Sequence, residues 1–371
     1  MELNDFGAYI PSLNLNFKKR HDETVVGVHK RNHEISIKDQ THQLIQEVGG
    51  LEKIIAPGDK VLIKANASHP RPVPEGAVVN TQIVYALIEE AFQAGAEEVK
   101  VGDASGDKNG TIQVFHDLGY RPIINKTGAQ LIDLNQPPYM RVEVPFAAGL
   151  AHKSYIFSEE LRQFDVLISA AKMKTHSEAQ VTLGMKNLVG MPPVKPFIGA
   201  SRKVLHKSID SENIAKNLES KEKFEDYISN KVKIEGEKLP NERLCRSIID
   251  LNLIFPIAFT VIDGVIGMQG QGPWKGNAIS TNVMLAGFNV LATDATAARI
   301  MGFQPEDIRK FQLAQERELG SYKMKDIKLI GDDIKELIQS CSGNFIIILY
   351  YFLTYSGEEF FVSLDKFISE K

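Results

Sequence analysis

The sequence has few cysteines and no long hydrophobic run. Its 371 residues include only two cysteines, Cys245 and Cys341, which are far apart and have no CxxC partner. This count excludes an iron–sulfur cluster held wholly by thiolates of this chain, and it excludes zinc sites of the Cys type. We therefore interpret each cysteine as a small buried hydrophobic residue.

The chain also lacks an excess of positive charge. It carries 43 Lys and Arg against 47 Asp and Glu, for a net charge of −4, so no basic field favours nucleic acid and none is expected as a partner. The longest apolar run, 345–353, is about half the roughly 20 residues that a membrane-spanning helix needs. We interpret it as a buried strand or core helix and expect no membrane partner. The first twenty residues lack the pattern of a secretory signal, so we expect a cytoplasmic location.

Short β-branched runs alternate with amphipathic stretches, a pattern typical of parallel α/β units. The sequence therefore predicts an α/β fold of mostly parallel sheets with flanking helices, arranged as two lobes with a cleft and a charged helical insertion. Strands are predicted at 25–28, 61–65, 98–102, 131–134, 165–170, 259–262, 283–286 and 326–330, and the clearest helices at 81–94 and 289–301.

The predicted organisation has four parts. An N-terminal extension covers 1–23, a first α/β lobe 24–155, a second α/β lobe 156–330, and a C-terminal helix with the apolar segment 331–371. The charged insertion at 207–241 lies in the second lobe. It is either a solvated helical excursion or a lid over a site whose walls come from its flanks.

The loops that follow the predicted strands are the first places to look for a site, because open α/β sheets bind ligands beyond the carboxyl ends of their strands. After 61–65, a proline-braced loop carries donors for an anionic group, or it is only a stiff turn with exposed polar residues. After 98–102, small residues expose N–H groups to a phosphate or carboxylate, or form a generic strand-end turn. The candidates are Lys64, Asn66, His69 and Arg71 in the first loop, and Asp103 and Ser105 in the second.

The segment after the predicted strand 165–170 is the richest in chemistry. Lys172, Lys174, Thr175 and His176 follow it directly, and a buried ammonium without a partner is costly, so we expect these side chains to face a pocket. Further on, Lys186 and Asn187 lie among small and apolar residues. A desolvated lysine there could be a nucleophile, base or covalent anchor, whereas the alternative is a lysine that extends to solvent from a core helix.

A fourth loop, after 259–262, begins with Asp263 and Gly264 and is rich in glycine as far as Gly276. Its backbone must approach something closely or adopt positive φ angles, yet it matches neither a Walker A loop nor a Rossmann fingerprint. Asp294 either closes this pocket or caps its own helix. His206, near Arg202 and Lys203, is a further candidate, with a basic helix face as the alternative.

Together these segments resemble the bacterial and archaeal family catalogued as domain of unknown function 362, over about residues 24–320. Many relatives carry a fused ferredoxin-like module with cysteine clusters. With two isolated cysteines, this chain resembles the stand-alone domain, and the resemblance implies no iron–sulfur cluster. The resemblance is carried by Lys64-x-Asn66, the loop 102–106, Lys172-x-Lys174-Thr175-His176 with Thr182, Lys186-Asn187-Leu-x-Gly190, Leu205-His206 and Asp263-Gly264.

The chain is also distantly similar to the nickel-pincer lactate racemases. The similarity lies in the order of His69-Pro-Arg71-Pro-x-Pro74, His176, Lys186 and His206. It implies that His176 is an acid/base and that Lys186 anchors a nickel-pincer nucleotide. It further implies that His206 is a metal ligand and that Arg71 clamps an anion of the cofactor or substrate.

Our leading hypothesis is an enzyme that binds a small anionic ligand, a carboxylate or phosphate, in a cleft between the lobes. The expected chemistry is racemase-like or isomerase-like proton or hydride transfer next to a carboxylate, with His176 as the base and Lys186 as the second catalytic residue. The cofactor is unknown, with a nickel-pincer nucleotide as the candidate. The alternative is a non-catalytic cofactor-binding or redox-partner subunit related to iron–sulfur centre proteins. A homo-oligomer and a redox partner protein are left open.

Overall fold

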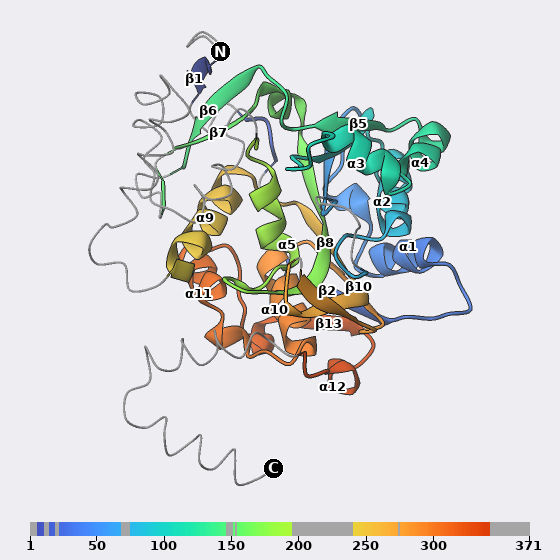
Figure 1. Cartoon of the computed structure of the whole chain (residues 1–371). Helices are drawn as coiled ribbons and strands as arrows, with labels where there is room; N and C mark the ends of the chain where they lie inside the picture. Colours follow the sequence, from blue (N-terminus) through green and yellow to red (C-terminus); the bar gives the residue numbers. More distant parts are fainter. Residues whose placement is uncertain are drawn as a thin grey trace.

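The computed structural model describes residues 6–10, 15–18, 22–67, 75–145, 151–152, 154–194, 240–273 and 275–341. At its centre lies a sheet of ten strands (Figure 1). The strands of this sheet are β2 (Val25–Lys30), β3 (Lys60–Ala65), β4 (Glu98–Asp103), β5 (Gln130–Asp133), β8 (Val166–His176), β9 (Gln180–Val181), β10 (Phe259–Gln271), β11 (Lys275–Ile279), β12 (Val283–Gly287) and β13 (Lys328–Gly331).

The strand order is β13-β2-β12-β10-β8-β3-β4-β5, and β9 and β11 pair as hairpins with β8 and β10. Every neighbouring pair from β10 to β5 is parallel, whereas β12 is antiparallel to both of its neighbours. The predicted class, α/β with a mostly parallel sheet and flanking helices, is therefore confirmed. A smaller sheet of order β1-β6-β7 is formed by β1 (Phe6–Ile10), β6 (Tyr139–Glu143) and β7 (Ser154–Ser158).

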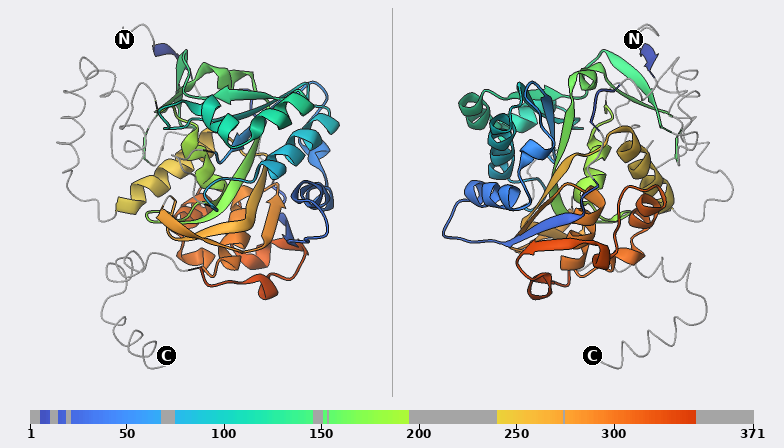
Figure 2. Two further views of the ribbon diagram at one scale, coloured as in Figure 1. Left: turned by 45° about the vertical axis from the view of Figure 1, so that its right-hand side comes forward. Right: turned by 180° about the vertical axis from the view of Figure 1, so that it is seen from behind.

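Helices cover both faces of the large sheet (Figures 1 and 2). Their apolar residues form two hydrophobic cores, one on each face. One face carries α1 (Ile37–Glu47), α2 (Thr81–Gln93), α3 (Thr111–Asp117) and α4 (Tyr120–Thr127); the other carries α5 (Leu183–Lys186), α9 (Pro240–Ile254), α10 (Val290–Ile300) and α11 (Arg309–Glu316). The remaining short elements are α12 (Ile334–Leu337) and the 3-10 turns η3 (Leu51–Lys53), η4 (Glu159–Gln163), η5 (Asn187–Gly190), η6 (Pro305–Asp307) and η7 (Met324–Asp326).

The central strand β8 shows how the sequence divides its side chains between the two cores. Residues at even positions, such as Ile168 and Ala170, pack on the side of α1 to α4, whereas Leu167 and Met173 at odd positions pack on the side of α5, α9, α10 and α11. This alternation is the period of two that a strand imposes. All eleven residues of β8 are buried, so the strand is part of both cores.

Both predicted helices are confirmed, and their caps explain their limits. Asn80 accepts a hydrogen bond from Gln82 N at the start of α2, and Asn289 does the same for Ala292 N at the start of α10. The predicted strands are also present, but two are much longer than predicted: β8 continues to His176, and β10 continues to Gln271.

Strands from both predicted lobes belong to the same sheet, because β2 of the first lobe lies between β13 and β12 of the second. The boundary predicted between 155 and 156 does not separate two sheets, and the division into lobes stays a prediction. Of the predicted insertion, 207–239 lie outside the described residues, as do 342–371, which include the apolar run 345–353. In the part that is described, no helix combines the length and the apolar character needed to cross a bilayer.

Both cysteines are buried, as predicted. Burial raises the pKa of Cys245 to about 12 and that of Cys341 to about 11. The reactive form of cysteine is the thiolate, so both residues act as apolar side chains at neutral pH.

Candidate functional site

The carboxyl ends of β10, β8, β3 and β4 meet at one edge of the sheet, because these four neighbouring strands are parallel. The chain places five charged side chains at this edge, and each is at most 4% exposed. We call them the edge cluster: Lys64 from β3, Asp103 from β4, Lys172 and Lys174 from β8, and Asp263 from β10.

These residues lie within the strands and not only in the loops after them. We predicted that Lys172 to His176 follow a strand that ends at Ala170, and that Asp263 and Gly264 open a strand-end loop; the structure corrects both predictions. In the register of the sheet, Lys172 is paired with Asp263, and Lys174 with Met268. A strand can continue through a buried lysine when a carboxylate on the next strand compensates its charge.

The first ion pair of the edge cluster joins β3 to β4. Lys64 Nζ lies 2.8 Å from Asp103 Oδ1 and also donates to Ala65 O. The other oxygen of Asp103 accepts from Ala67 N at 3.2 Å. Gly190 passes directly over this pair: a Cβ at that position would lie 2.5 Å from Asp103 Oδ1 and 2.9 Å from Lys64 Nζ. Only glycine fits there without displacing the pair.

The second ion pair joins β8 to β10. Lys172 Nζ donates to Asp263 Oδ2 at 2.6 Å. The same oxygen accepts from Asn80 N at 2.7 Å, and Oδ1 accepts from Val265 N at 3.0 Å. Asp263 therefore ties β8 to the residue that caps α2. Its buried carboxylate is held by one ammonium group and two backbone N–H groups.

Two amides connect Lys174 to the backbone of Lys64, a member of the first ion pair. Lys174 Nζ donates to Ala77 O at 2.7 Å and to Asn66 Oδ1 at 3.1 Å. Asn66 donates to Asn187 Oδ1 at 3.4 Å, and Asn187 Nδ2 donates to Lys64 O at 2.7 Å. The predicted residues Lys64, Asn66, Lys174 and Asn187 are thus brought together, from segments far apart in the sequence.

His176 and Thr175 end β8 beside the tip of the β10–β11 hairpin. Thr175 Oγ1 donates to Gly270 O at 3.0 Å. His176 is 8% exposed, and its Nδ1 accepts from Glu178 N at 3.0 Å and from Ala179 N at 3.1 Å, within the turn to β9. Lys186, the last residue of α5, is half-buried.

The turn between β9 and α5 is held between two buried charges, which we call the turn clamp: Asp294 from α10 and Lys310 from α11. Asp294 accepts from Gly184 N at 2.7 Å and from Met185 N at 3.0 Å. Lys310 Nζ donates to the carbonyl oxygens of Val181 and Thr182. The clamp fixes the segment that continues into Lys186 and Asn187.

Burial shifts the pKa values of both clamp residues toward neutrality. It raises the pKa of Asp294 to about 7 and lowers that of Lys310 to about 8. Of the two roles predicted for Asp294, helix capping is wrong, because Asn289 caps α10. Asp294 binds the neighbouring turn, which carries a left-handed Leu183 at φ 63°; such a φ is strained for a side chain of this size.

Two glycines of the glycine-rich segment, Gly264 in β10 and Gly272 directly after it, allow strands to pack closely. A Cβ on Gly272 would lie 2.0 Å from Thr175 O, and one on Gly264 would lie 2.8 Å from Val283. The close approach that the glycine-rich segment requires is therefore to β8 and β12.

Ser105, predicted to bind an anion, is buried and shapes its own loop. Its N–H donates to Thr111 Oγ1, its Oγ accepts from Asp107 N, and its carbonyl accepts from Asn135. We had not identified Asn135 from the sequence, although its place directly after the predicted strand 131–134 was a usable signal. It also accepts from Val194 N at 2.6 Å, so it organises the surroundings of the edge cluster.

Tyr120 is another residue that sequence reasoning missed. It is fully buried at the start of α4, and among the described residues its hydroxyl has no hydrogen-bond partner. Burial raises its pKa above the usual value, and the carboxylates of Asp103 and Asp263 raise it further. The phenol thus lies within electrostatic range of both ion pairs.

Three predicted residues, His69, Arg71 and His206, lie outside the described residues. Within the described ranges, no three His, Cys, Asp or Glu side chains gather as metal ligands.

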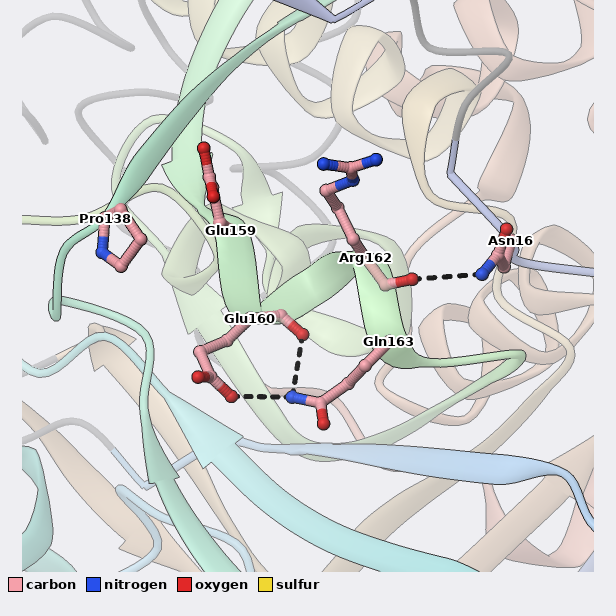
Figure 3. A pocket seen from close by; sticks show the side chains of 6 residues that line it. All are labelled: Asn16, Pro138, Glu159, Glu160, Arg162 and Gln163. Carbon is pink, nitrogen blue, oxygen red and sulfur yellow. Dashed lines mark hydrogen bonds between the residues drawn. The ribbon is translucent and has the colours of Figure 1, made fainter. Parts of the chain in front are cut away.

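A surface pocket of about 510 Å³ lies away from the edge cluster, around η4 at the amino end of β8 (Figure 3). There Asn16 donates to Arg162 O and Gln163 donates to Glu160. None of the six lining residues belongs to the predicted site.

Comparison with known proteins agrees with the resemblance seen in the sequence. No solved structure matches this chain. A thylakoid-associated protein of Synechocystis sp., sll1697, is 23% identical over 276 residues, which cover 74% of this chain and 72% of that protein. The model of the family described as "Domain of unknown function (DUF362)" matches residues 61–299, which contain the edge cluster and, of the turn clamp, Asp294. That match spans more than half of the sequence, so the chain belongs to the DUF362 family.

Proposed function

We propose that the chain is an enzyme that binds a small carboxylate or phosphate ligand at the edge cluster. It transfers a proton at a carbon next to a carboxylate, as racemases and isomerases do. The proposal rests on one observation: two buried ion pairs lie at the carboxyl edge of adjacent parallel strands. They join Lys64 to Asp103 and Lys172 to Asp263. This edge is where open α/β sheets bind their ligands.

The arrangement is more easily explained by function than by stability. Burying two charges costs several kcal/mol per ion, and well-packed apolar residues of similar volume are often as stabilising. Earlier in β3 and β8, at positions such as Ile63 and Ile168, the strands do use apolar residues. The change to lysine comes only at the carboxyl edge.

The residues at this edge suit an anionic ligand and proton transfer. The lysines supply ammonium groups, and the amides of Asn66 and Asn187 supply directional hydrogen bonds close to them. His176 and Lys186 are the two predicted catalytic groups, and imidazole and a desolvated amine can both exchange protons near neutral pH.

The similarity to nickel-pincer racemases implies a metal-containing nucleotide. The residues carried over as anion clamp and metal ligand, Arg71 and His206, lie outside the described ranges. We therefore derive no step through such a group and limit the proposal to proton transfer by the chain's own residues.

Thermal unfolding of the full chain with lactate or inorganic phosphate tests the binding step. At about 10 mM, roughly ten times the upper end of common KM values, a bound ligand should raise the Tm by about 2 °C for a chain of this length. Lys174→Gln should abolish the rise, whereas Lys325→Gln, on an exposed lysine, should keep it. No rise with either probe, relative to sodium chloride of equal ionic strength, would contradict the proposal.

Incubation of lactate with the protein in D₂O, followed by proton NMR, tests the reaction step. Proton transfer at the carbon should replace its hydrogen by deuterium. Binding without exchange would instead support the alternative, a non-catalytic cofactor-binding or redox-partner subunit. The cytoplasmic location, a redox partner protein and a homo-oligomer stay predictions. The cyanobacterial relative is described as a thylakoid-associated protein.

A further inference from the structure

Helix α1 packs beside α2 (Figure 1), and its contact face carries a stripe of three polar side chains. Lys38, His42 and Gln46 are four residues apart in sequence, so they lie on one face of the helix. This face meets the last turns of α2, where Glu89 and Glu90 are adjacent. The stripe thus brings its hydrogen-bond donors to two neighbouring carboxylates of another helix.

His42, in the middle of the stripe, lies between the two carboxylates. Its Nδ1 is 2.6 Å from Glu90 Oε1, and its Nε2 is 2.9 Å from Glu89 Oε2. An ionised carboxylate can only accept hydrogen bonds, so each ring nitrogen must be a donor. A neutral imidazole has one N–H and an imidazolium has two. Both contacts together therefore require the imidazolium.

The buried carboxylate of Glu90 needs this positive charge. Its side chain is only 4% exposed, and its other oxygen accepts from Gln46 Nε2 at 2.6 Å. With a neutral ring, the amide would be the remaining side-chain donor to Glu90 in the described part of the chain. A buried carboxylate without a compensating charge is costly. Glu89 is more exposed and also accepts from Lys38 Nζ at 2.9 Å.

The other ionisable groups near the helix pair have contacts of their own. Asp39 of α1 accepts from the hydroxyl of the residue that caps the helix, at 2.7 Å. Tyr85 of α2 and Lys126 of α4 form a cation–π pair, with 5.4 Å from Nζ to the ring centre. On β2, His29 contacts Glu47 at the far end of α1, and the five buried residues of β12 carry no charge.

We propose that His42 is a pH-sensitive latch that, as an imidazolium between Glu89 and Glu90, holds α1 against α2. When the ring loses a proton as pH rises, one nitrogen presents a lone pair to a carboxylate oxygen. An attractive contact then becomes repulsive, and α1 loosens from α2. The latched helix contacts the edge cluster, because its capping residue Asn80 donates to Asp263. The latch does not depend on the proposed enzymatic function.

The direction of the pH effect follows from the contacts of the ring. The hydrogen bond to Glu90 raises the pKa of His42 most, burial lowers it, and the bond to Glu89 raises it further, so that it lies above the ordinary value of 6.5. Because folding raises this pKa, the stabilising contribution of His42 is complete below the unfolded value and is lost as pH rises through the folded one. Contact with Glu89 raises the pKa of Lys38, so this ammonium stays charged throughout that change.

Long-range ¹H–¹⁵N NMR of the histidine rings of the full chain tests the protonation state directly. His42 is identified by the signal that disappears in His42→Gln. At pH 7, we expect both of its nitrogens to show the shift of a protonated nitrogen. One protonated and one unprotonated nitrogen at this pH would overturn the inference. Glu90→Gln should lower the pH at which the ring titrates, and an unchanged titration would also overturn it.

Backbone hydrogen exchange of the full chain, measured by mass spectrometry, tests the latch itself. At pH 6, residues 37–47 should exchange about tenfold faster in His42→Gln than in the parent, for the loss of hydrogen bonds to charged groups. At pH 9, the two proteins should exchange equally. Residues 290–300 should not differ at either pH, and His33→Gln, on an exposed histidine, should match the parent. A difference over 37–47 that is equal at both pH values, or absent at both, would overturn the inference.

Discussion

The edge cluster and the turn clamp both bury opposite charges, but they satisfy them differently. In the edge cluster, lysine and aspartate contact each other directly, at 2.8 Å and 2.6 Å. In the clamp, Asp294 binds N–H groups of the turn and Lys310 binds carbonyl groups of the same turn. The peptide dipoles of Val181 to Met185 thus bridge the two charges.

The comparison indicates what each arrangement is suited to do. A direct pair depends on its partner, because removal of one member leaves a buried charge uncompensated. In the clamp, burial moves the pKa of Asp294 up to about 7 and that of Lys310 down to about 8. The edge cluster therefore depends on direct contact between its charges, whereas the clamp is a scaffold whose charge state depends on pH.

The largest expected effect comes from breaking a direct pair. Lys172→Met should lower the free energy of unfolding by about 3–5 kcal/mol, because it leaves the carboxylate of Asp263 buried without its ammonium. The double variant Lys172→Met with Asp263→Asn should be more stable than the single variant, since the amide oxygen still accepts from a backbone N–H. Urea unfolding measures both. A double variant whose loss equals the sum of the two single losses would show that the two residues do not form a coupled pair.

A smaller effect is expected from crowding the other pair. Gly190→Ala places a methyl group 2.5 Å from Asp103 Oδ1, and such overpacking costs about 1–3 kcal/mol. Gly106→Ala is the matched control, because its Cβ would come no closer than 3.8 Å to any neighbour. In the control, the free energy of unfolding should be unchanged or rise by less than about 1 kcal/mol. If both variants unfold at the same urea concentration as the parent, Gly190 does not cover the pair tightly.

The smallest effect is a pH dependence that belongs to the clamp. Folding raises the pKa of Asp294, so the protonated carboxyl adds to the free energy of unfolding. This contribution is complete below the unfolded pKa near 4 and is lost as pH rises through the folded pKa of about 7. The free energy of unfolding of the parent, relative to that of Asp294→Asn, should therefore fall by about 1.4 kcal/mol per pH unit between pH 5 and pH 6. Urea unfolding at the two pH values measures it. A difference that does not change with pH would place the pKa of Asp294 near its ordinary value.

Sequence periodicity predicted most of the large sheet, because strands such as β3 and β4 alternate with amphipathic helices. It ended β8 and β10 too early, since Lys172 and Asp263 looked unsuited to a buried strand. Their suitability depends on each other, across 91 residues, and no local pattern encodes that pairing. The same limit applies to the clamp: Asp294 was noticed, but its partners Gly184 and Met185 become visible only when α10 packs on α5.

Some of the residues predicted for the site lie together in the fold, and whether they form a site stays a prediction. Lys64, Lys174 and Asn187 were chosen because polar groups follow buried strands, and the fold brings them together. Ser105 and the glycines after Asp263 were chosen because small residues expose the backbone, but the contacts of Ser105, Gly264 and Gly272 show that they shape a turn and allow strands to pack closely. Asn135 and Tyr120 were missed because an isolated polar residue has no pattern of its own.

The long sequence separations within the edge cluster set the order in which it can assemble. Thr182 reaches Lys172 O across only 10 residues, a local contact that can form early, whereas Asp263 must meet Asn80 across 183 residues. Contacts of such separation form slowly and require most of the chain to be in place. The edge cluster is therefore complete only in the fully folded chain. A ligand that binds all of it selects that state alone, so the binding energy protects the whole sheet against unfolding and proteolysis.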